Sequence, residues 1–190
     1  MNSPLININR LTAAAVLAVA FAMPTHAANV PLQSATATYS QENPELPGLW
    51  GAYKTIDGNA AGAFTSWAIY RADGIQAESI VWETQSDLTL DGTLPLRFDL
   101  HQQDGIPTPG HNLGRFRLSY TTDDRSQFAD GLSNGGDVSA NWVVIAPATV
   151  VSTGGETMTI LPDASVLVSG GTNAYPIYTV TTTLAVSGIT

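Results

Sequence analysis

The sequence predicts an all-β sandwich, and three features of the chain support this fold class. Apolar and polar residues alternate over residues 94–101 and again over residues 115–120, as in strands with one face on a core and one in water. The 17 Gly and 11 Pro among 190 residues divide the chain into short segments separated by turns. Beyond residue 28, no segment has the apolar periodicity of a helix of useful length.

The first 28 residues predict a secretory signal peptide. Arg10 precedes a run of thirteen residues at positions 11–23 that is apolar except for Thr12, and Pro24 then leads into small residues. Thirteen residues are too few to span a bilayer comfortably, so we expect cleavage after Ala27 or Ala28 rather than a retained anchor. The segment predicts export, with no membrane span after cleavage.

Short strands are expected throughout the mature chain. Residues 34–39 (SATATY) and 79–84 (SIVWET) are rich in β-branched and aromatic residues and lie on either side of turn-forming segments. Turn formers also fill the gap between residues 94–101 and 115–120, which predicts that these two strands pair as a long hairpin. Later strands are expected at residues 142–146, 157–161, 165–168 and 178–186.

This pattern divides the mature chain into three parts. Residues 33–122 form the first part of the sandwich, and residues 123–141, rich in Asp, Ser and Gly, predict a polar linker or long loop. Residues 142–190 supply strands that complete the sandwich or begin a second element. Four apolar side chains from the first part are expected to be buried together: Trp82, Phe98, Phe116 and Leu118.

Charge and cysteine content exclude several kinds of function. The net charge is −9, and removal of Arg10 with the signal peptide leaves six basic residues against sixteen acidic ones. Such a chain repels phosphate backbones, so nucleic acid is excluded as a partner. With no Cys, the chain has no disulfide framework, thiol nucleophile or zinc–thiolate site.

Aromatic residues in loops are the first candidate binding residues. Trp50 and Tyr53 lie among Pro and Gly, and Trp67 and Tyr70 lie beside the next turn-rich segment. Exposed aromatic rings stack on the apolar face of sugars, while neighbouring polar groups bind sugar hydroxyls. For Trp67, and for Trp82 further along, burial in the core is the favoured alternative. Trp50 and Tyr53 therefore become the aromatic ligand-binding candidates.

Three arginines form the second candidate set. Arg97, Arg115 and Arg117 would share the polar face of the two hairpin strands, beside Asp99 and His101. Guanidinium groups in such a row bind an acidic sugar or a partner's carboxylates through paired hydrogen bonds. The alternative is a solvated face whose charges pair with one another and add little to stability.

Nothing in the sequence predicts an enzyme. His101 and His111 are the mature histidines, and neither lies in a nucleophile or metal-binding motif. Asp123 and Asp124 with Glu83 offer carboxylates for glycoside hydrolysis, but adjacent loop carboxylates are common and not specific. We therefore expect a non-catalytic protein.

The order of several motifs resembles one family. The motifs are ATATYSQ (35–41), IDGN (56–59), TSWA (65–68), Trp82-Glu83, LRFDLHQQ (96–103) and HNLGRFRLSYTTD (111–123). Together they resemble the discoidin-type, galactose-binding-like jelly roll of large secreted and surface proteins of bacteria. The resemblance covers about residues 33–122. It implies a jelly-roll β-sandwich and a secreted, periplasmic or bacterial cell-surface location.

The tail is similar to an element that accompanies such domains. In those relatives a closing strand comes after a GIT motif, whereas this sequence stops at Gly188-Ile189-Thr190. The comparison predicts a sandwich that is incomplete at its C-terminus, in a fragment of a longer chain, with an unpaired strand edge.

A calcium ion is the expected cofactor. Asp57 and Asn59 with Thr65 gather hard oxygen ligands of the kind that calcium prefers. The resemblance implies a structural Ca²⁺ held by these residues. The alternative is an Asx-type turn in which Gly58 takes a positive φ.

Two functions from different classes follow from these residues. The leading expectation is an exported, non-catalytic binding or adhesion module that binds carbohydrate or a cell-surface glycan. The alternative is a structural or protein-interaction β-sandwich of a cell-surface protein, with another surface protein as partner and no small-molecule ligand.

Overall fold

The protein is an all-β chain in the computed structural model, which describes residues 28–42, 49–59, 66–74, 76–102, 111–171 and 175–190. The expected signal peptide lies outside these ranges apart from residue 28. Two short 3-10 helices are described, η1 (Ala52–Thr55) and η2 (Arg125–Gln127). The described strands are β1 (Leu32–Ala37), β2 (Ile80–Thr84), β3 (Leu88–Asp91), β4 (Leu96–His101), β5 (Arg115–Phe116), β6 (Ser119–Tyr120), β7 (Val143–Val144), β8 (Thr149–Ser152), β9 (Thr157–Ile160), β10 (Val166–Ser169), β11 (Ile177–Thr182) and β12 (Ala185–Ile189).

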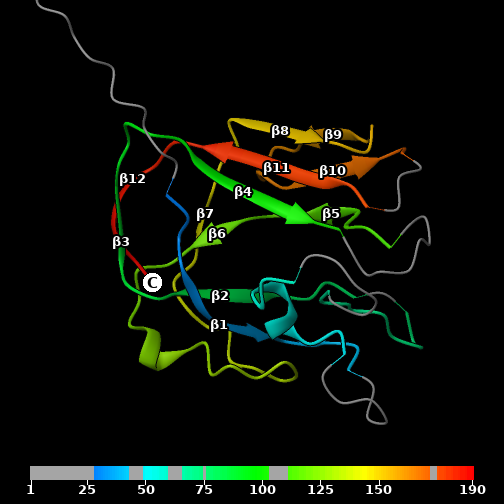
Figure 1. Ribbon diagram of the computed structural model, residues 1–190, viewed down its shortest axis with the longest axis horizontal. Helices are drawn as coiled ribbons and strands as arrows, with labels where there is room; N and C mark the ends of the chain where they lie inside the picture. Colours follow the sequence, from blue (N-terminus) through cyan, green and yellow to red (C-terminus); the bar gives the residue numbers. More distant parts are fainter. Residues whose placement is uncertain (1–27, 43–48, 60–65, 75, 103–110, 172–174) are drawn as a thin grey trace, which may run out of the picture.

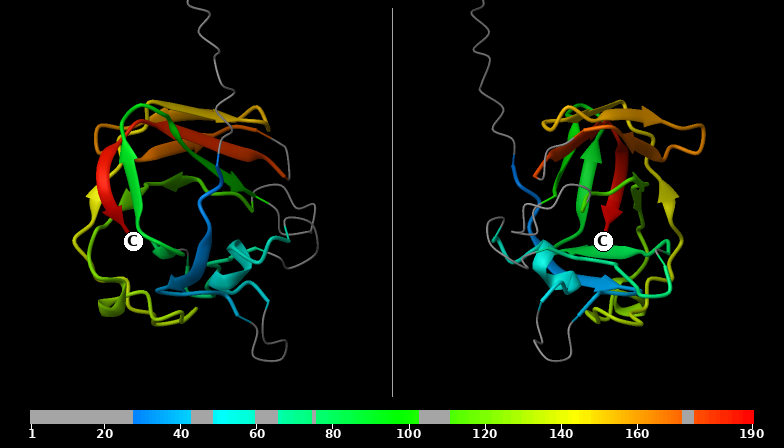
Figure 2. Two further views of the ribbon diagram at one scale, coloured as in Figure 1. Left: turned by 60° about the vertical axis from the view of Figure 1, so that its left-hand side comes forward. Right: turned by 90° about the vertical axis from the view of Figure 1, so that its right-hand side faces the viewer.

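The strands form antiparallel sheets arranged in two layers. One layer contains the sheets β4–β11–β8 and β5–β10–β9, and the other contains the pair β1–β2 with η1 on it. The pair β3–β12 closes one side between the layers, and the pair β6–β7 lies between them (Figures 1 and 2). In the described part of the chain, no helix is long and apolar enough to cross a membrane.

Strand β11 is the centre of the first layer. It alternates between half-buried and buried residues, and Tyr178 and Val180 are fully buried on its inner face. Its register places Phe98 of β4 and Val150 of β8 on either side of Val180. A period-two sequence of β-branched and aromatic residues therefore forms a strand here because one face packs on the core.

Strand β10 joins the same core. Val166 is 1% exposed and lies opposite Phe116 of β5, whose ring stacks on Tyr178 with the ring centroids 6.2 Å apart. Ile145, just after β7, is also 1% exposed. The stacking of Phe116 on Tyr178 therefore packs the sheet β5–β10–β9 against the sheet β4–β11–β8.

The second layer has a core of small residues. Ala35 and Ala37 of β1 and Ala52 of η1 are buried, and larger side chains pack around them. Those larger side chains are Ile56, Trp67, Ile80 and Trp82. Small residues on β1 allow the indole rings and η1 to approach the strand closely, and the rings remain half-buried.

The acidic segment at residues 123–141 is a long loop that lies along β1. Ala37 N–H donates to the Leu132 carbonyl at 2.8 Å, and Gly136 N–H donates to the Ala37 carbonyl at 3.0 Å. Side chains of the same loop accept from the backbone N–H groups of Ser40 and Ala52, at 2.8 and 3.0 Å. The loop therefore supplies the hydrogen bonds that a neighbouring strand would supply to β1.

The expected hairpin between residues 94–101 and 115–120 is wrong. β4 pairs with β11, β5 pairs with β10, and β6 pairs with β7. An alternating strand fits any antiparallel neighbour that presents an apolar face on the same side, so alternation alone does not choose the partner.

The expected common burial of Trp82 with the two phenylalanines is also wrong. Trp82 packs on the alanine core of the second layer, whereas Phe116 stacks on Tyr178 in the first. Trp82, Phe98, Phe116 and Leu118 are all half-buried. The error follows from the hairpin, because a different pairing places each side chain in a different part of the core.

Strand boundaries account for the remaining differences. The single strand expected at residues 178–186 is divided into β11 and β12, and β12 contains a register shift between Val186 and Ile189 where Gly188 has φ +79°. Such a residue bends a strand and displaces its pairing, as in a β-bulge. Strands β3 and β8, of four residues each, were not expected.

Candidate ligand-binding edge

Three segments that are separate in sequence meet beside η1. Gln41 N–H donates to the Ala68 carbonyl at 2.8 Å, and Ala68 N–H donates to the Trp50 carbonyl at 3.4 Å. The Tyr39 hydroxyl donates to the Tyr70 carbonyl at 3.1 Å. These bonds gather five aromatic residues into what we call the aromatic edge: Tyr39, Trp50, Tyr53, Trp67 and Tyr70.

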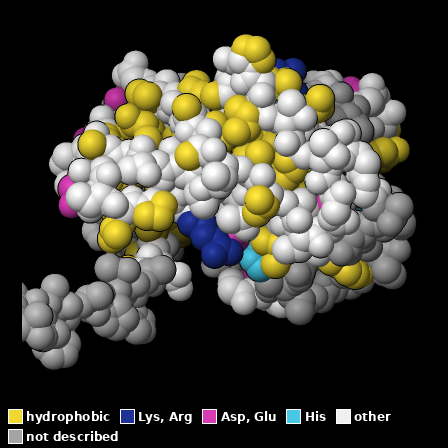
Figure 3. Space-filling model, turned by 90° about the horizontal axis from the view of Figure 1, so that it is seen from above, with side chains coloured by type: hydrophobic (Ala, Val, Ile, Leu, Met, Phe, Trp, Pro, Cys, Tyr) yellow, Lys and Arg dark blue, Asp and Glu magenta, His cyan; other side chains and the backbone are white. Residues whose placement is uncertain are grey.

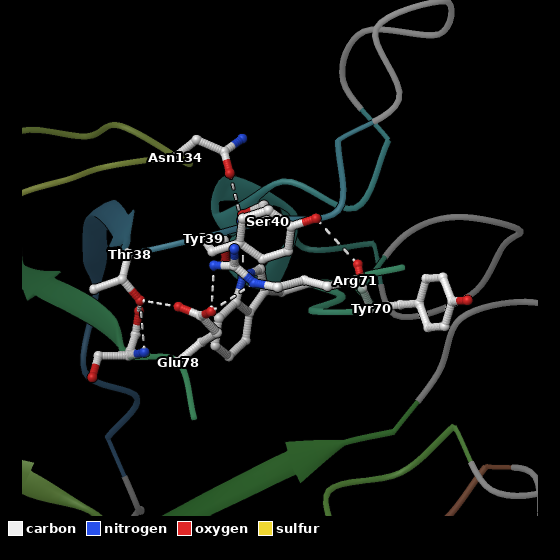
Figure 4. A network of polar contacts seen from close by, with 9 residues as sticks. Thr38, Tyr39, Ser40, Tyr70, Arg71, Glu78 and Asn134 are labelled. Atoms are coloured by element: carbon white, nitrogen blue, oxygen red, sulfur yellow. Dashed lines mark hydrogen bonds and ion pairs between the residues drawn. The ribbon is translucent and has the colours of Figure 1, made fainter. Parts of the chain in front are cut away.

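Arg71 organises the polar part of this edge (Figure 4). Its guanidinium carbon lies 3.6 Å from the centroid of the Tyr39 ring, and its Nε and Nη2 donate to Glu78 Oε1 at 3.0 and 2.5 Å. The other Glu78 oxygen accepts from the Thr38 hydroxyl at 2.6 Å. The Glu78 side chain is 6% exposed, so the carboxylate is buried but fully bonded.

Trp67 ties the edge to β1. Its indole N–H donates to the Tyr39 carbonyl at 3.0 Å and to the Ser40 hydroxyl at 3.1 Å. Its ring packs on the alanine core, as does that of Trp82, whose N–H donates to Thr55 Oγ1 at 2.7 Å. Both indoles therefore pack on the core while their polar ends stay bonded, which is the usual arrangement for half-buried Trp.

The remaining aromatic side chains of the edge are more open. Tyr70 is 63% exposed, and its ring points away from the polar network in Figure 4. Tyr53 is 39% exposed, and Lys54 Nζ lies 5.3 Å from its ring centroid. Trp50 is half-buried and has a backbone φ of 61°, a conformation that costs a bulky residue energy. The edge thus combines two exposed rings with charged and hydroxyl groups held in place.

The expected calcium loop has local hydrogen bonds. Asp57 Oδ1 accepts from the Asn59 N–H at 2.8 Å, Asp57 Oδ2 lies 3.5 Å from Lys54 Nζ, and Gly58 has φ +76°. This is the geometry of an Asx turn. Thr65 lies outside the described residues. The described part of the chain contains no group of three His, Cys, Asp or Glu residues that could hold a metal ion. The ammonium beside Asp57 opposes a bound cation, and calcium at this loop stays a prediction.

Calcium binding is tested by melting. If Asp57 and Asn59 hold calcium in the native loop alone, a hundredfold excess over Kd should stabilise the protein by about 2.7 kcal/mol. Asp57→Ala should remove this increment, and Asp87→Ala, a carboxylate elsewhere on the surface, should retain it. Equal melting temperatures of the wild-type protein in EDTA and in millimolar calcium would reduce Asp57 to a turn residue.

Each of two predicted arginines has its own carboxylate partner. Arg97 Nε donates to Asp99 Oδ1 at 2.9 Å. Burial alone would raise the pKa of Asp99, but hydrogen bonds from Thr179 and Arg97 outweigh it and hold the pKa below its usual value. Arg115 Nη2 donates to Asp163 Oδ2 at 2.7 Å. The Ser165 hydroxyl and N–H bond Asp163 as well, and with Arg115 they lower its pKa to about 2.

The predicted arginine face is therefore not assembled as expected. Arg97 belongs to the sheet β4–β11–β8, whereas Arg115 belongs to β5–β10–β9. Arg117 is exposed between β5 and β6. The shared face depended on the pairing of the two hairpin strands, so it is lost with the hairpin.

The carboxylates considered for hydrolysis have structural roles. Asp123 accepts hydrogen bonds from Asn141, and Asp124 caps η2 by accepting from the Ser126 N–H at 2.9 Å. Glu83 accepts from the Gln33 amide at 2.6 Å and lies 3.7 Å from Arg125. Each of these bonds holds a loop or a strand in place.

The sequence pattern did not indicate the polar members of the edge, namely Tyr39, Arg71 and Glu78. The available signal was Tyr70-Arg71 in a segment without strand periodicity, with a carboxylate seven residues after the arginine. Seven residues would place both side chains on one face of a helix, but the segment has no helical periodicity, and an odd spacing places them on opposite faces of a strand. The contact is therefore visible only in the folded loop.

The fold and this edge define a class of protein. It is an all-β sandwich whose smaller layer carries, at one end, a surface of aromatic rings beside hydrogen-bonded polar side chains. Protein-family models, curated proteins and solved structures were compared with the chain, and none matches it.

Proposed function

We propose that the protein is a non-catalytic binding module whose ligand is a carbohydrate, and that the aromatic edge is its binding surface. The observation that carries this proposal is the exposure of Tyr70 and Tyr53 beside a fixed Arg71–Glu78–Tyr39 network. Large exposed rings otherwise cost hydration free energy, and sugar C–H faces cover such rings well.

The polar groups have a supporting role in this proposal. Arg71 and Glu78 are already bonded to each other, so they hold the Tyr39 ring and the residues next to Tyr70 in place. Lys54 Nζ and the tyrosine hydroxyls supply donors and acceptors for sugar hydroxyls at the rim. A prearranged surface of this kind loses little conformational entropy when a ligand binds.

We further propose that the module is exported and acts in the periplasm, in the medium or on a bacterial cell surface. The support is the layout of residues 1–28, together with the resemblance of residues 33–122 to galactose-binding-like jelly rolls. N-terminal sequencing of secreted protein should find Ala28 or Asn29 first, and a mature protein beginning at Met1 would contradict export.

A glycan array with the mature protein tests the carbohydrate proposal. Tyr70→Ala should weaken binding roughly tenfold or more, because it removes the most exposed ring of the edge. Tyr53→Ala should have the same direction of effect. Leu94→Ala is the matched control, since Leu94 is 59% exposed and lies between β3 and β4, away from the edge.

The array also separates the two candidate functions. Binding that Tyr70→Ala abolishes and Leu94→Ala leaves intact supports the glycan-binding module. If the correctly folded protein binds no glycan on the array, the result favours the alternative, a structural or protein-interaction sandwich of a surface protein.

A further inference from the structure

Strand β4 forms an edge of its sheet. In the sheet order β4–β11–β8 it pairs with β11 on one side, and among the described residues no strand pairs with its other side. Figure 1 shows β4 on the side of β11 that faces away from β8. An open edge of six residues is long enough to take a further strand.

The register shows which backbone groups lie on the open side. Gln102 N–H donates to the Pro176 carbonyl at 3.0 Å, in line with the β4–β11 register. Because hydrogen-bonded pairs alternate along an antiparallel ladder, Leu96, Phe98 and Leu100 use their backbone groups toward β11. The N–H and C=O groups of Arg97, Asp99 and His101 therefore point to the open side.

Charges on this edge alternate in sign. The Arg97 side chain is 63% exposed and that of Asp99 is 34% exposed, and both lie on the outer face of β4. Edge strands are usually protected by charges that repel an incoming copy. Opposite charges two positions apart can instead attract an incoming copy. In one antiparallel register, each charge of the strand lies opposite a charge of the other sign on the second copy.

We propose that β4 pairs with β4 of a second copy of this chain, antiparallel about a two-fold axis at Phe98. In this register Arg97 lies opposite Asp99 of the second copy, and Leu96 lies opposite Leu100. A shift of the axis to Arg97 or to Asp99 places like charges opposite each other, so the sequence of the edge selects the Phe98 register.

The surroundings of the edge favour this partner. Figure 3 looks down on the first layer, where hydrophobic and uncharged side chains predominate and acidic ones are few. Val151 of β8, in the same sheet as β4, is 57% exposed. The net charge of −9 opposes self-association in general, so the pairing depends on the matched charges of the edge. Pro95 lacks an N–H and ends the ladder just outside β4, so the pairing is short and specific.

Sedimentation of the mature protein tests the proposal, and it does so whether or not a glycan binds. A monomer–dimer equilibrium is expected between about 1 and 200 µM. Arg97→Asp should raise the dissociation constant roughly tenfold or more, because like charges then face each other twice across the axis. The exchange variant R97D/D99R should restore dimerisation, since each charge again meets its opposite.

Arg115→Asp is the matched control. It makes the same change of charge at an exposed arginine on β5, which lies in another sheet, and it should leave the dissociation constant unchanged. Thermal melting of all variants confirms that they are folded. Recovery in the exchange variant cannot come from a fold defect, so it supports the β4 interface directly. A wild-type protein that stays monomeric over this range overturns the proposal, as does a dimer that Arg97→Asp leaves intact.

Discussion

Tyr178→Ala should lower the free energy of unfolding by about 3–5 kcal/mol, the largest effect that we expect from a single substitution. Tyr178 is fully buried at the centre of β11, and its ring stacks on Phe116. Removing the ring leaves a cavity between β11 and β5 that the flanking strands cannot fill. Urea unfolding followed by fluorescence measures the loss as a lower midpoint with an unchanged slope.

Tyr178→Phe is the matched control for this prediction. The Tyr178 hydroxyl is buried and has no hydrogen-bond partner among the described residues. Removing it should therefore change stability by less than about 1 kcal/mol, or raise it, because no hydrogen bond is lost and no polar group remains buried. A large loss in Tyr178→Phe would show that the hydroxyl is bonded after all.

Alkaline pH provides a second readout at the same residue. Burial, with a smaller contribution from Glu156, raises the pKa of Tyr178 from 10.0 to about 12. Between these values the folded chain keeps a proton that the unfolded chain has lost, so stability falls as pH rises, by at most about 1.4 kcal/mol per pH unit. Below pH 10, Tyr178 is protonated in both the folded and the unfolded chain, so its ionisation does not change the free energy of unfolding with pH. Tyr178→Phe should lack this decline.

Gly136→Ala should cost about 3 kcal/mol, the next largest effect. A Cβ at this position would lie 2.5 Å from Thr36 Cγ2, 2.7 Å from the Leu132 carbonyl oxygen and 2.9 Å from the Ala37 carbonyl oxygen. The two carbonyls accept the hydrogen bonds that tie the loop at residues 123–141 to β1. The clash therefore cannot be relieved without breaking those bonds.

Gly114→Ala provides the comparison, measured by the same urea unfolding. No heavy atom lies within 4 Å of the Cβ that alanine would add there, and the glycine does not have a positive φ. Its stability should stay within about 1 kcal/mol of wild type, because alanine reduces only the freedom of the unfolded chain. Equal losses at both positions would show that the loop is not packed on β1.

The sequence by itself determined the fold class and most strand segments. Alternation is a local property, so the strands at residues 96–101 and 177–182 were evident from the period of their apolar residues. Turn positions were evident for the same reason, since Asp57 and Gly58 form an Asx turn among neighbours in sequence. Of the exposed rings of the candidate site, Tyr53 was evident because it lies among Pro and Gly, whereas the sequence did not select Tyr70, which lies between Ile69 and Arg71.

Tertiary structure alone decided how these pieces meet. Strand pairing joins residues about 80 apart, as between Phe98 and Val180, and many strands of this chain present an apolar face to which β4 could pair. Pairing then decided the rest: it placed Arg97 and Arg115 in different sheets, left one side of β4 without a described partner strand and placed Trp82 apart from Phe116. The contact of Arg71 with Tyr39 and Glu78 was likewise hidden, because it depends on a loop without periodicity whose path is set by long-range hydrogen bonds to β1 and Trp50.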